Sequence, residues 1–258
     1  MILYSISTKA KIDKSVIIGP YAIIEDDVEI GADTTIGSYV VIRKGTRIGT
    51  GNAIHAGVQL GVDPQDHHFH GESSWCLIGD DNIIREYATI SRATGEGEQT
   101  VIGDGNFIMT YVHIAHNCTI GNNTVISSGT QIGGYVTIDD YVTIGGLCGI
   151  HQFCHIGIYA MLGAMSYLNK DLPPFLLARG NRARAYGLNT RGLRRNLYSW
   201  QEIEDIKRVY RQFSDSPFTI RECIKNLKTE ECSEHILEIV KFIESSKRNF
   251  LPFKDDST

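Results

Sequence analysis

The chain has 258 residues, of which 42% are hydrophobic and 21% are charged, so the sequence predicts one or two folded domains and excludes a largely disordered protein. Its 25 basic and 30 acidic residues give a net charge of −5, which argues against a general nucleic-acid or anionic-membrane binder. No run of 18 apolar residues is present to span a bilayer, and the first residues do not resemble a signal peptide. The six cysteines form no CxxC pair. We therefore expect a cytoplasmic protein with reduced cysteines.

From residue 6 to residue 168 the sequence repeats with a period of six. Of the 28 positions whose numbers are multiples of six, 22 are Ile and three are Leu, and Gly often follows directly. Neither an α-helix nor an ordinary strand has this period. A six-residue repeat is typical of a parallel β-helix, in which each hexad forms one short strand and a turn. At roughly 1.5–3 kcal/mol per fully buried large aliphatic side chain, the inward-pointing columns would dominate the stability of the fold.

Three exceptions to the repeat locate two loops. The charged residues Asp66, Glu72 and Glu96 occupy positions that are otherwise aliphatic. We therefore expect residues 61–77 and 91–101 to leave the coil as surface loops. Loops on a rigid scaffold are where functional residues concentrate.

The C-terminal third of the chain changes its period. Pro173-Pro174 follow the last repeat, and beyond them the apolar spacing becomes helical. Ser199–Glu202 and Thr219–Glu222 have the pattern of capping boxes, which mark helix N-termini. We predict a β-helix domain over residues 1–189 and a small domain of about three helices over residues 190–258. So few residues make a marginal core, so we expect the helices to pack on the coil or on another subunit.

Histidines gather at one edge of the predicted coil. Residues 18 apart lie above one another when three hexads form a coil, and His116, Gly134 and Gln152 meet that condition. A neutral imidazole suits proton abstraction near neutral pH, which makes His116 a candidate general base. At Gly134 the backbone could approach an acyl carbonyl closely and offer an N–H to a developing oxyanion. His113 and His151 flank the same edge.

Two other interpretations of these histidines remain open. They could be solvated surface residues without a function. Alternatively, His113, His116 and His151 could hold a zinc ion with an open position that activates water. The His67–His70 segment is a second, looser histidine cluster.

A basic segment follows the coil. Between Leu172 and Gln201 there is no acidic residue, and six arginines occur there: Arg179, Arg182, Arg184, Arg191, Arg194 and Arg195. Arginine is suited to bidentate contacts with phosphate. This segment could therefore hold a nucleotide diphosphate or dock an acidic carrier protein, and the alternative is a solvated linker.

Four stretches of the chain resemble a known family. They are GVDPQDHHFHGESSWCLIGDDNIIREYATISR (61–92), HIAHNCTIGN (113–122), GIHQFCHIG (149–157) and DLPPFLLARGN (171–181). Together they resemble the acyl-(acyl carrier protein)–UDP-N-acetylglucosamine O-acyltransferases, which begin lipid A synthesis, and the resemblance covers nearly the whole chain. It implies a homotrimer of left-handed parallel β-helices, each with a C-terminal α-helical domain, and active sites between neighbouring subunits.

The resemblance also implies the reaction. A (3-hydroxy)acyl chain would pass from the thioester of acyl carrier protein to the glucosamine 3-hydroxyl of UDP-N-acetylglucosamine, with no metal or other cofactor. His116 matches the family's general base, and Gly134 matches the backbone N–H that stabilises the oxyanion. The positions implied in substrate binding are Gln65, Asp66, His68, His113, Tyr135, His151, Gln152, Ala164, Asn189 and Arg195.

Several positions depart from the family pattern. Asn117 stands where an aspartate often follows the catalytic histidine, and Ala164 stands where the residue that limits acyl length is often Gly. The added methyl group at Ala164 predicts a shorter preferred acyl chain. The remaining departures are His68, Tyr135, Arg191 and Asn196.

Other functions stay open at this point. They are the related N-acyltransferases, a coenzyme-A-dependent acetyltransferase, a zinc hydratase and a purely structural coil, and the acceptor could be a 3-amino sugar.

Overall fold

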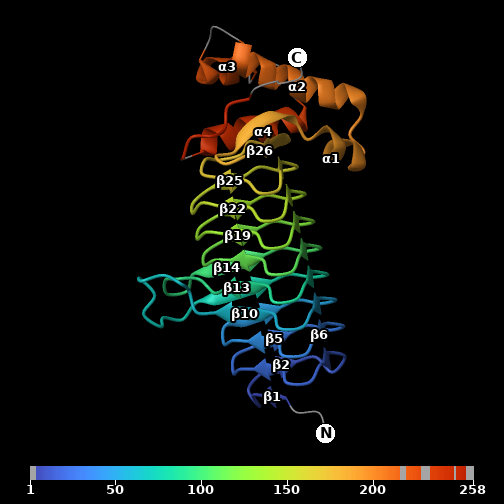
Figure 1. The fold of residues 1–258 in the computed structure, drawn as a ribbon, viewed down its shortest axis with the longest axis vertical. Helices are drawn as coiled ribbons and strands as arrows, with labels where there is room; N and C mark the ends of the chain where they lie inside the picture. Colours follow the sequence, from blue (N-terminus) through green and yellow to red (C-terminus); the bar gives the residue numbers. More distant parts are fainter. Residues whose placement is uncertain (1–3, 216–218, 228–232, 247, 254–258) are drawn as a thin grey trace.

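The structure is a computed structural model that describes residues 4–215, 219–227, 233–246 and 248–253. Most of the chain winds as a parallel β-helix, a stack of coils whose strands line up in three sheets (Figure 1). We call the sheets face A, face B and face C, in the order in which the chain meets them. The turns from face A to face B form the A–B corner, and the turns from face C to face A form the C–A corner.

As far as β25, each face takes every third strand of the coil, as the period of 18 residues requires, and face C then adds β26 and β27. Face A consists of β1 (Ser5–Ile6), β4 (Ile23–Ile24), β7 (Val41–Ile42), β10 (Gln59–Val62), β13 (Thr89–Ser91), β16 (His113–Ile114), β19 (Gln131–Ile132), β22 (Gly149–Ile150) and β25 (Tyr167–Leu168). Face B consists of β2 (Lys11–Ile12), β5 (Glu29–Ile30), β8 (Thr46–Ile48), β11 (Trp75–Ile78), β14 (Gln99–Ile102), β17 (Thr119–Ile120), β20 (Thr137–Ile138) and β23 (His155–Ile156). Face C consists of β3 (Ile17–Ile18), β6 (Thr35–Ile36), β9 (Ala53–Ile54), β12 (Ile83–Ile84), β15 (Phe107–Ile108), β18 (Val125–Ile126), β21 (Thr143–Ile144), β24 (Met161–Leu162), β26 (Leu176–Arg179) and β27 (Arg184–Leu188).

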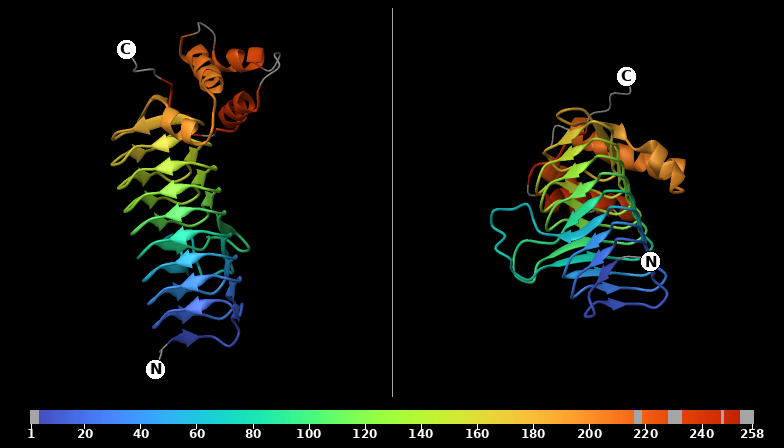
Figure 2. Two further views of the ribbon diagram at one scale, coloured as in Figure 1. Left: turned by 90° about the vertical axis from the view of Figure 1, so that its right-hand side faces the viewer. Right: turned by 60° about the horizontal axis from the view of Figure 1, so that its bottom comes forward.

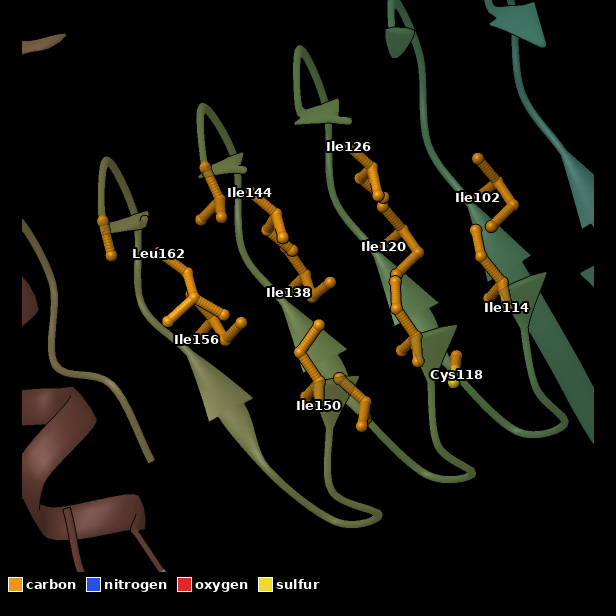
Figure 3. Close-up of a cluster of buried hydrophobic side chains, with 14 of the residues drawn as sticks. Ile102, Ile114, Cys118, Ile120, Ile126, Ile138, Ile144, Ile150, Ile156 and Leu162 are labelled. Carbon is orange, nitrogen blue, oxygen red and sulfur yellow. The ribbon is translucent and has the colours of Figure 1, made fainter. Parts of the chain in front are cut away.

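The aliphatic repeat fills the interior of the coil. Ile114 pairs in register with Ile132, and Ile132 pairs with Ile150. These three side chains are at most 3% exposed. Figure 3 shows the same inward stacking for the isoleucines of neighbouring strands. The predicted parallel β-helix is therefore confirmed, and its core is a set of continuous isoleucine columns.

Two loops leave the coil on one side, where Figure 1 shows them as a protrusion at the level of β10 and β13. They are shorter than the sequence suggested. The first comprises residues 63–74, because β10 continues to Val62 and β11 begins at Trp75. The second comprises residues 92–98, between β13 and β14. The strands extend further because the ends of the two loops pair with each other, Val62 with Ser91 and Trp75 with Gln99.

The hexapeptide pattern ends at Leu168, but the coil continues for one more strand. β26 follows the two prolines and pairs in parallel with β24. β27 then turns back antiparallel to β26, which ends the stack. The chain becomes helical directly afterwards, and the division of the chain into domains at residues 189 and 190 stays a prediction.

Four helices lie within the described residues, one more than the sequence predicted: α1 (Thr190–Arg195), α2 (Trp200–Asp215), α3 (Ile220–Leu227) and α4 (Glu234–Ser245). The additional one, α1, lies in the basic segment. Both predicted capping boxes form, since Ser199 and Thr219 each exchange hydrogen bonds with the glutamate three residues later. None of the described helices is long and apolar enough to cross a membrane.

The helices pack on the last coils, as both views in Figure 2 show. The buried Tyr210 hydroxyl of α2 donates a 2.7 Å hydrogen bond to the Pro174 carbonyl. The Phe242 ring of α4 lies 4.4 Å from the His155 ring of β23. These contacts cover the end of the coil that would otherwise expose its core.

Candidate active site

The A–B corner brings the predicted histidine edge together. His116, Gly134 and Gln152 lie in successive turns, after β16, β19 and β22. The Tyr135 N–H donates to the His116 carbonyl and the Phe153 N–H donates to the Gly134 carbonyl, each at 3.0 Å. The predicted stacking of these three positions is therefore confirmed.

Each turn at this corner is closed by a residue in the left-handed region. The φ angles are 57° at Asn117, 59° at Tyr135 and 66° at Phe153. Asparagine tolerates this conformation, whereas an aromatic residue requires support from its surroundings. That support is a column of rings: the Tyr135 and Phe153 rings stack with centres 4.9 Å apart, and the His116 and Tyr135 rings lie nearly perpendicular with centres 5.3 Å apart.

The imidazole of His116 lies against the backbone of the next coil. Its side chain is only 11% exposed. A Cβ atom built on Gly134 would lie 2.7 Å from His116 Nε2 and 2.8 Å from Cε1. Only glycine therefore leaves room for the ring at this position, which is a structural reason for Gly134 beside any role of its N–H.

Asn117 fixes the proton on the His116 ring. Its Oδ1 accepts the Thr94 N–H at 2.9 Å, and its Nδ2 donates to the Thr94 carbonyl at 3.1 Å, so the orientation of the amide is determined. The same Oδ1 lies 2.9 Å from His116 Nδ1. Because an amide oxygen can only accept, Nδ1 carries the hydrogen and Nε2 keeps its lone pair.

Asp66 faces that lone pair from the 63–74 loop. Its Oδ2 lies 3.8 Å from His116 Nε2. The His68 N–H and the His68 ring bond to Oδ1 at 3.1 Å and 2.9 Å, and these bonds lower the pKa of the Asp66 carboxyl to about 2. Asp66 is therefore a carboxylate at any pH near neutrality, and it presents negative charge to whatever approaches His116.

A groove of about 460 Å³ runs over face A beside His116. Gln65, His113, Gly134, His151, Gln152 and Tyr167 are among the residues that line it. His113 Nδ1 lies 2.7 Å from the Thr89 hydroxyl. Burial, followed by the nearby His116, lowers the pKa of His113, so this ring is neutral at pH 7 and can donate or accept a hydrogen bond.

The remaining predicted positions lie outside this groove. His68 is 89% exposed and bonds only to Asp66 among the described residues. Ala164 is exposed at the C–A corner, in the turn between β24 and β25. Arg195 is exposed in the last turn of α1.

Asn189 is engaged within the chain. It is buried, its Oδ1 accepts the Gly192 N–H as the N-cap of α1, and its Nδ2 donates to the Tyr159 carbonyl. The sequence did not suggest this structural use, and its role in nucleotide binding stays a prediction.

Sequence reasoning missed two residues that organise the site, Thr94 and Arg92. Both lie in the 92–98 loop and are buried. Their only signal in the sequence is their place next to a gap in the repeat. Within the described part of the chain, no group of three or more His, Cys, Asp or Glu side chains is arranged to hold a metal ion.

Comparison with known proteins gives matches along the whole chain. A family model described as UDP-N-acetylglucosamine O-acyltransferase, domain 2, matches residues 171–251, and the bacterial transferase hexapeptide model matches residues 9–44, 27–62 and 99–134. The acyl-(acyl carrier protein)–UDP-N-acetylglucosamine O-acyltransferase of Thermodesulfovibrio yellowstonii is 44% identical and is aligned over 94% of this chain and 95% of its own. The enzyme of the same name from a Sulfurovum species is 42% identical, over 95% and 94%.

Solved structures agree with these matches. The UDP-N-acetylglucosamine acyltransferase of Francisella novicida superimposes with a TM-score of 0.93 at 34% identity, covering 100% of this chain and 96% of that one. The O-acyltransferase of Moraxella catarrhalis gives 0.92 at 37% identity, covering 96% and 97%. The likeness confirms a left-handed parallel β-helix with a small helical C-terminal part.

Proposed function

The chain belongs to the acyl-(acyl carrier protein)–UDP-N-acetylglucosamine O-acyltransferases of lipid A biosynthesis, and on this premise we propose the donor, the base and the path of the proton. The donor is the thioester of a (3-hydroxy)acyl chain on acyl carrier protein. The acceptor is the glucosamine 3-hydroxyl of UDP-N-acetylglucosamine. The observation that carries this proposal is the single available lone pair of His116, which lines the groove: it lies on Nε2, 3.8 Å from Asp66 Oδ2.

His116 acts as the general base. Nε2 takes the proton from the sugar hydroxyl while that oxygen attacks the thioester carbonyl carbon. The C–S bond then breaks, and the departing sulfur receives the proton from the imidazolium to give the free thiol of the carrier. Asn117 keeps Nδ1 protonated throughout, so Nε2 is the only ring nitrogen that exchanges a proton.

Gly134 stabilises the tetrahedral intermediate. Among the described residues, no acceptor bonds to the Gly134 N–H, whereas its carbonyl is used within the corner. A free backbone N–H beside the base can donate to the oxyanion that forms from the thioester carbonyl. The close approach of His116 to Gly134 supports this assignment, because the reaction needs the base and the oxyanion donor near the same carbonyl carbon.

Asp66 holds the sugar. Its carboxylate accepts hydrogen bonds from sugar hydroxyls and orients the acceptor toward Nε2. Gln65, His68, His113, His151 and Gln152 supply further polar contacts around the acceptor and the acyl carbonyl. Tyr135 supports the His116 ring from its edge. None of these roles requires a metal or a prosthetic group, since acyl transfer from a thioester to a hydroxyl needs only a base and an oxyanion donor.

The nucleotide and the carrier protein bind through the basic segment. Arg195 contacts the nucleotide phosphate, and Asn189 shapes the nucleotide site by capping α1. Exposed arginines on β26, β27 and α1 provide positive charge for an acidic carrier protein. Ala164 limits the length of the acyl chain from the C–A corner.

We also propose that the enzyme is a homotrimer with sites between subunits. A column of apolar side chains runs along the C–A corner, and each is at least 49% exposed in the single chain: Tyr21, Tyr39, Tyr87, Tyr111, Leu147 and Met165. Such a ridge is unusual on a monomer and fits burial against another subunit. Light scattering should give the mass of three chains of 28.7 kDa, and an active single chain would contradict the assembly.

A cytoplasmic location is consistent with the thiols. The described cysteines, Cys76, Cys118, Cys148, Cys154 and Cys223, are all buried and free. Free thiols are typical of a reducing compartment.

The test is a transfer assay with purified protein. UDP-N-acetylglucosamine or its 3-amino analogue is mixed with 3-hydroxyacyl carrier proteins of several lengths, and product and released thiol are measured. The wild type should transfer to the 3-hydroxyl, and His116→Ala should retain less than a tenth of the rate while remaining trimeric. Transfer from acyl-coenzyme A alone would refute acyl carrier protein as the donor. A rate above a tenth of the wild type in His116→Ala would refute His116 as the base.

A further inference from the structure

The two loops beside the active site are joined by one buried arginine. Arg92 lies at the start of the 92–98 loop, and its side chain is only 4% exposed. Its Nη2 donates to Asp63 Oδ1 at 2.8 Å. Its guanidinium carbon lies 4.9 Å from the centre of the Phe69 ring, in cation–π geometry. Its backbone N–H donates to the Val62 carbonyl at 3.0 Å.

These contacts bracket Asp66. Asp63 lies three residues before it and Phe69 three residues after it, so one guanidinium holds both ends of the segment. Inside the segment, the Phe69 N–H donates to the Asp66 carbonyl at 3.1 Å. This bond links the Asp66 backbone to Phe69, and the contact of the Phe69 ring with Arg92 links both to the 92–98 loop.

The same loop also holds His116. Two residues after Arg92, Thr94 exchanges two hydrogen bonds with the Asn117 amide, which bonds in turn to His116 Nδ1. The 92–98 loop is thus attached to Asp66 through Arg92 and to His116 through Thr94. The two attachments lie on either side of the Asp66 Oδ2–His116 Nε2 pair, whose atoms are 3.8 Å apart.

The burial of Arg92 lowers the stability of the fold, so stability does not explain why an arginine is buried here. Among the described residues, its Nε has no hydrogen-bond partner, and neither does the neighbouring Ser91 hydroxyl. A buried polar atom without a partner is destabilising, and an apolar side chain could fill the same volume without that cost. A positioning role explains this arrangement. Only a planar guanidinium can bond to Asp63 with its edge while it stacks on Phe69 with its face, and so hold both residues in place.

We propose that Arg92 is a positioning residue that sets the Asp66 carboxylate against His116, and this inference rests on the proposed function. Arg92 is not among the residues that line the groove beside His116. It acts through Asp66, so its loss should weaken the hold on the sugar and misalign the 3-hydroxyl. A displacement of about 1 Å at a reacting centre can cost about 10²-fold in rate.

The experiment compares Arg92→Met and Arg92→Lys with a matched control. Arg47→Met is that control, because Arg47 also pairs with an aspartate, Asp27 at 2.6 Å, and stacks on an aromatic ring, Trp75 at 4.6 Å, but lies on β8 of face B. For each variant, kcat and KM for UDP-N-acetylglucosamine are measured together with Tm. Arg92→Met should lower kcat/KM by about 10²-fold with a raised KM. Arg47→Met should lower Tm without changing kcat or KM. If Arg92→Met does not fold, the same measurements are made on Arg92→Lys.

A double variant tests whether Arg92 acts through Asp66. In an Asp66→Asn background, Arg92→Met should lower kcat/KM no further, because the carboxylate that it positions is already lost. Multiplicative losses, or wild-type kcat/KM in Arg92→Met, would overturn the inference. If the wild type shows no transfer, the proposed function fails by itself. Hydrogen exchange of the 63–72 amides then decides the inference, which requires faster exchange in Arg92→Met than in Arg47→Met.

Discussion

Replacing Gly134 with alanine places a methyl group against the imidazole of His116. The new Cβ would lie 2.7 Å from Nε2, whereas ordinary contacts begin at 3.4 Å, so the ring must retreat by about 0.7 Å. The backbone of Gly134 is not in the left-handed region, so the substitution adds no backbone strain. Overpacking of this kind costs about 1–3 kcal/mol, and each kcal/mol lowers Tm by about 2–4 °C in a chain of this size. Displacement of His116, the proposed base, should lower kcat by about 10²-fold.

The assay is a double-mutant cycle with His116→Ala. Tm and kcat are measured for the wild type, both single variants and the double variant. In the His116→Ala background the methyl group meets no ring, so the loss of Tm caused by Gly134→Ala should disappear. An equal loss of Tm in both backgrounds would refute the steric argument. A Gly134→Ala enzyme within threefold of the wild-type rate would refute the assignment of His116 as the base at this position.

Four further predictions concern other residues. Asn117→Asp should lower both Tm and kcat/KM, because a carboxylate cannot donate to the Thr94 carbonyl and so weakens the link between the 92–98 loop and His116; unchanged values would contradict the role of the amide. His113→Gln should lessen the acid sensitivity of Tm: burial lowers the pKa of His113 in the folded state, so below pH 6.5 only the unfolded chain takes up the proton readily, and the wild type should lose more stability than the variant between pH 7.5 and 5.5. Ala164→Gly should shift the preference toward longer acyl chains in an assay across chain lengths. An unchanged preference would contradict the proposal that Ala164 limits the length of the acyl chain. Arg195→Ala should mainly raise KM for the nucleotide sugar, and a pure turnover defect would contradict that contact.

The amide at Asn117 changes how the histidine is held. A carboxylate at this position would bond to Nδ1 but could not donate to the Thr94 carbonyl. The asparagine does both, so it fixes the ring and the 92–98 loop with one side chain. The departure from the family pattern therefore preserves the orientation of His116 and removes a negative charge beside it.

Much of the fold follows from the sequence because the period of six leaves few alternatives. An aliphatic residue at every sixth position can be buried only if the chain turns at the same interval, so Ile114, Ile132 and Ile150 had to stack. The stacking of His116 over Gly134 follows from the same arithmetic. The capping boxes were equally readable, since they are local signals. The last strand of the coil could not be predicted from the sequence, because β26 lacks the repeat and is held by its pairing with β24.

The sequence by itself determined the coil, its core and the corner at which the histidines meet, because these depend on spacing along the chain. Only the tertiary structure decided which side chains contact one another around His116 at the A–B corner. The approach of Asp66 to His116 joins residues 50 positions apart. The hydrogen bonds of Thr94 that orient the Asn117 amide, and the contact of Arg92 with Phe69, each join residues 23 positions apart, through loops in which the repeat is lost. No period links such residues, so their contacts depend on how the two loops fold against each other.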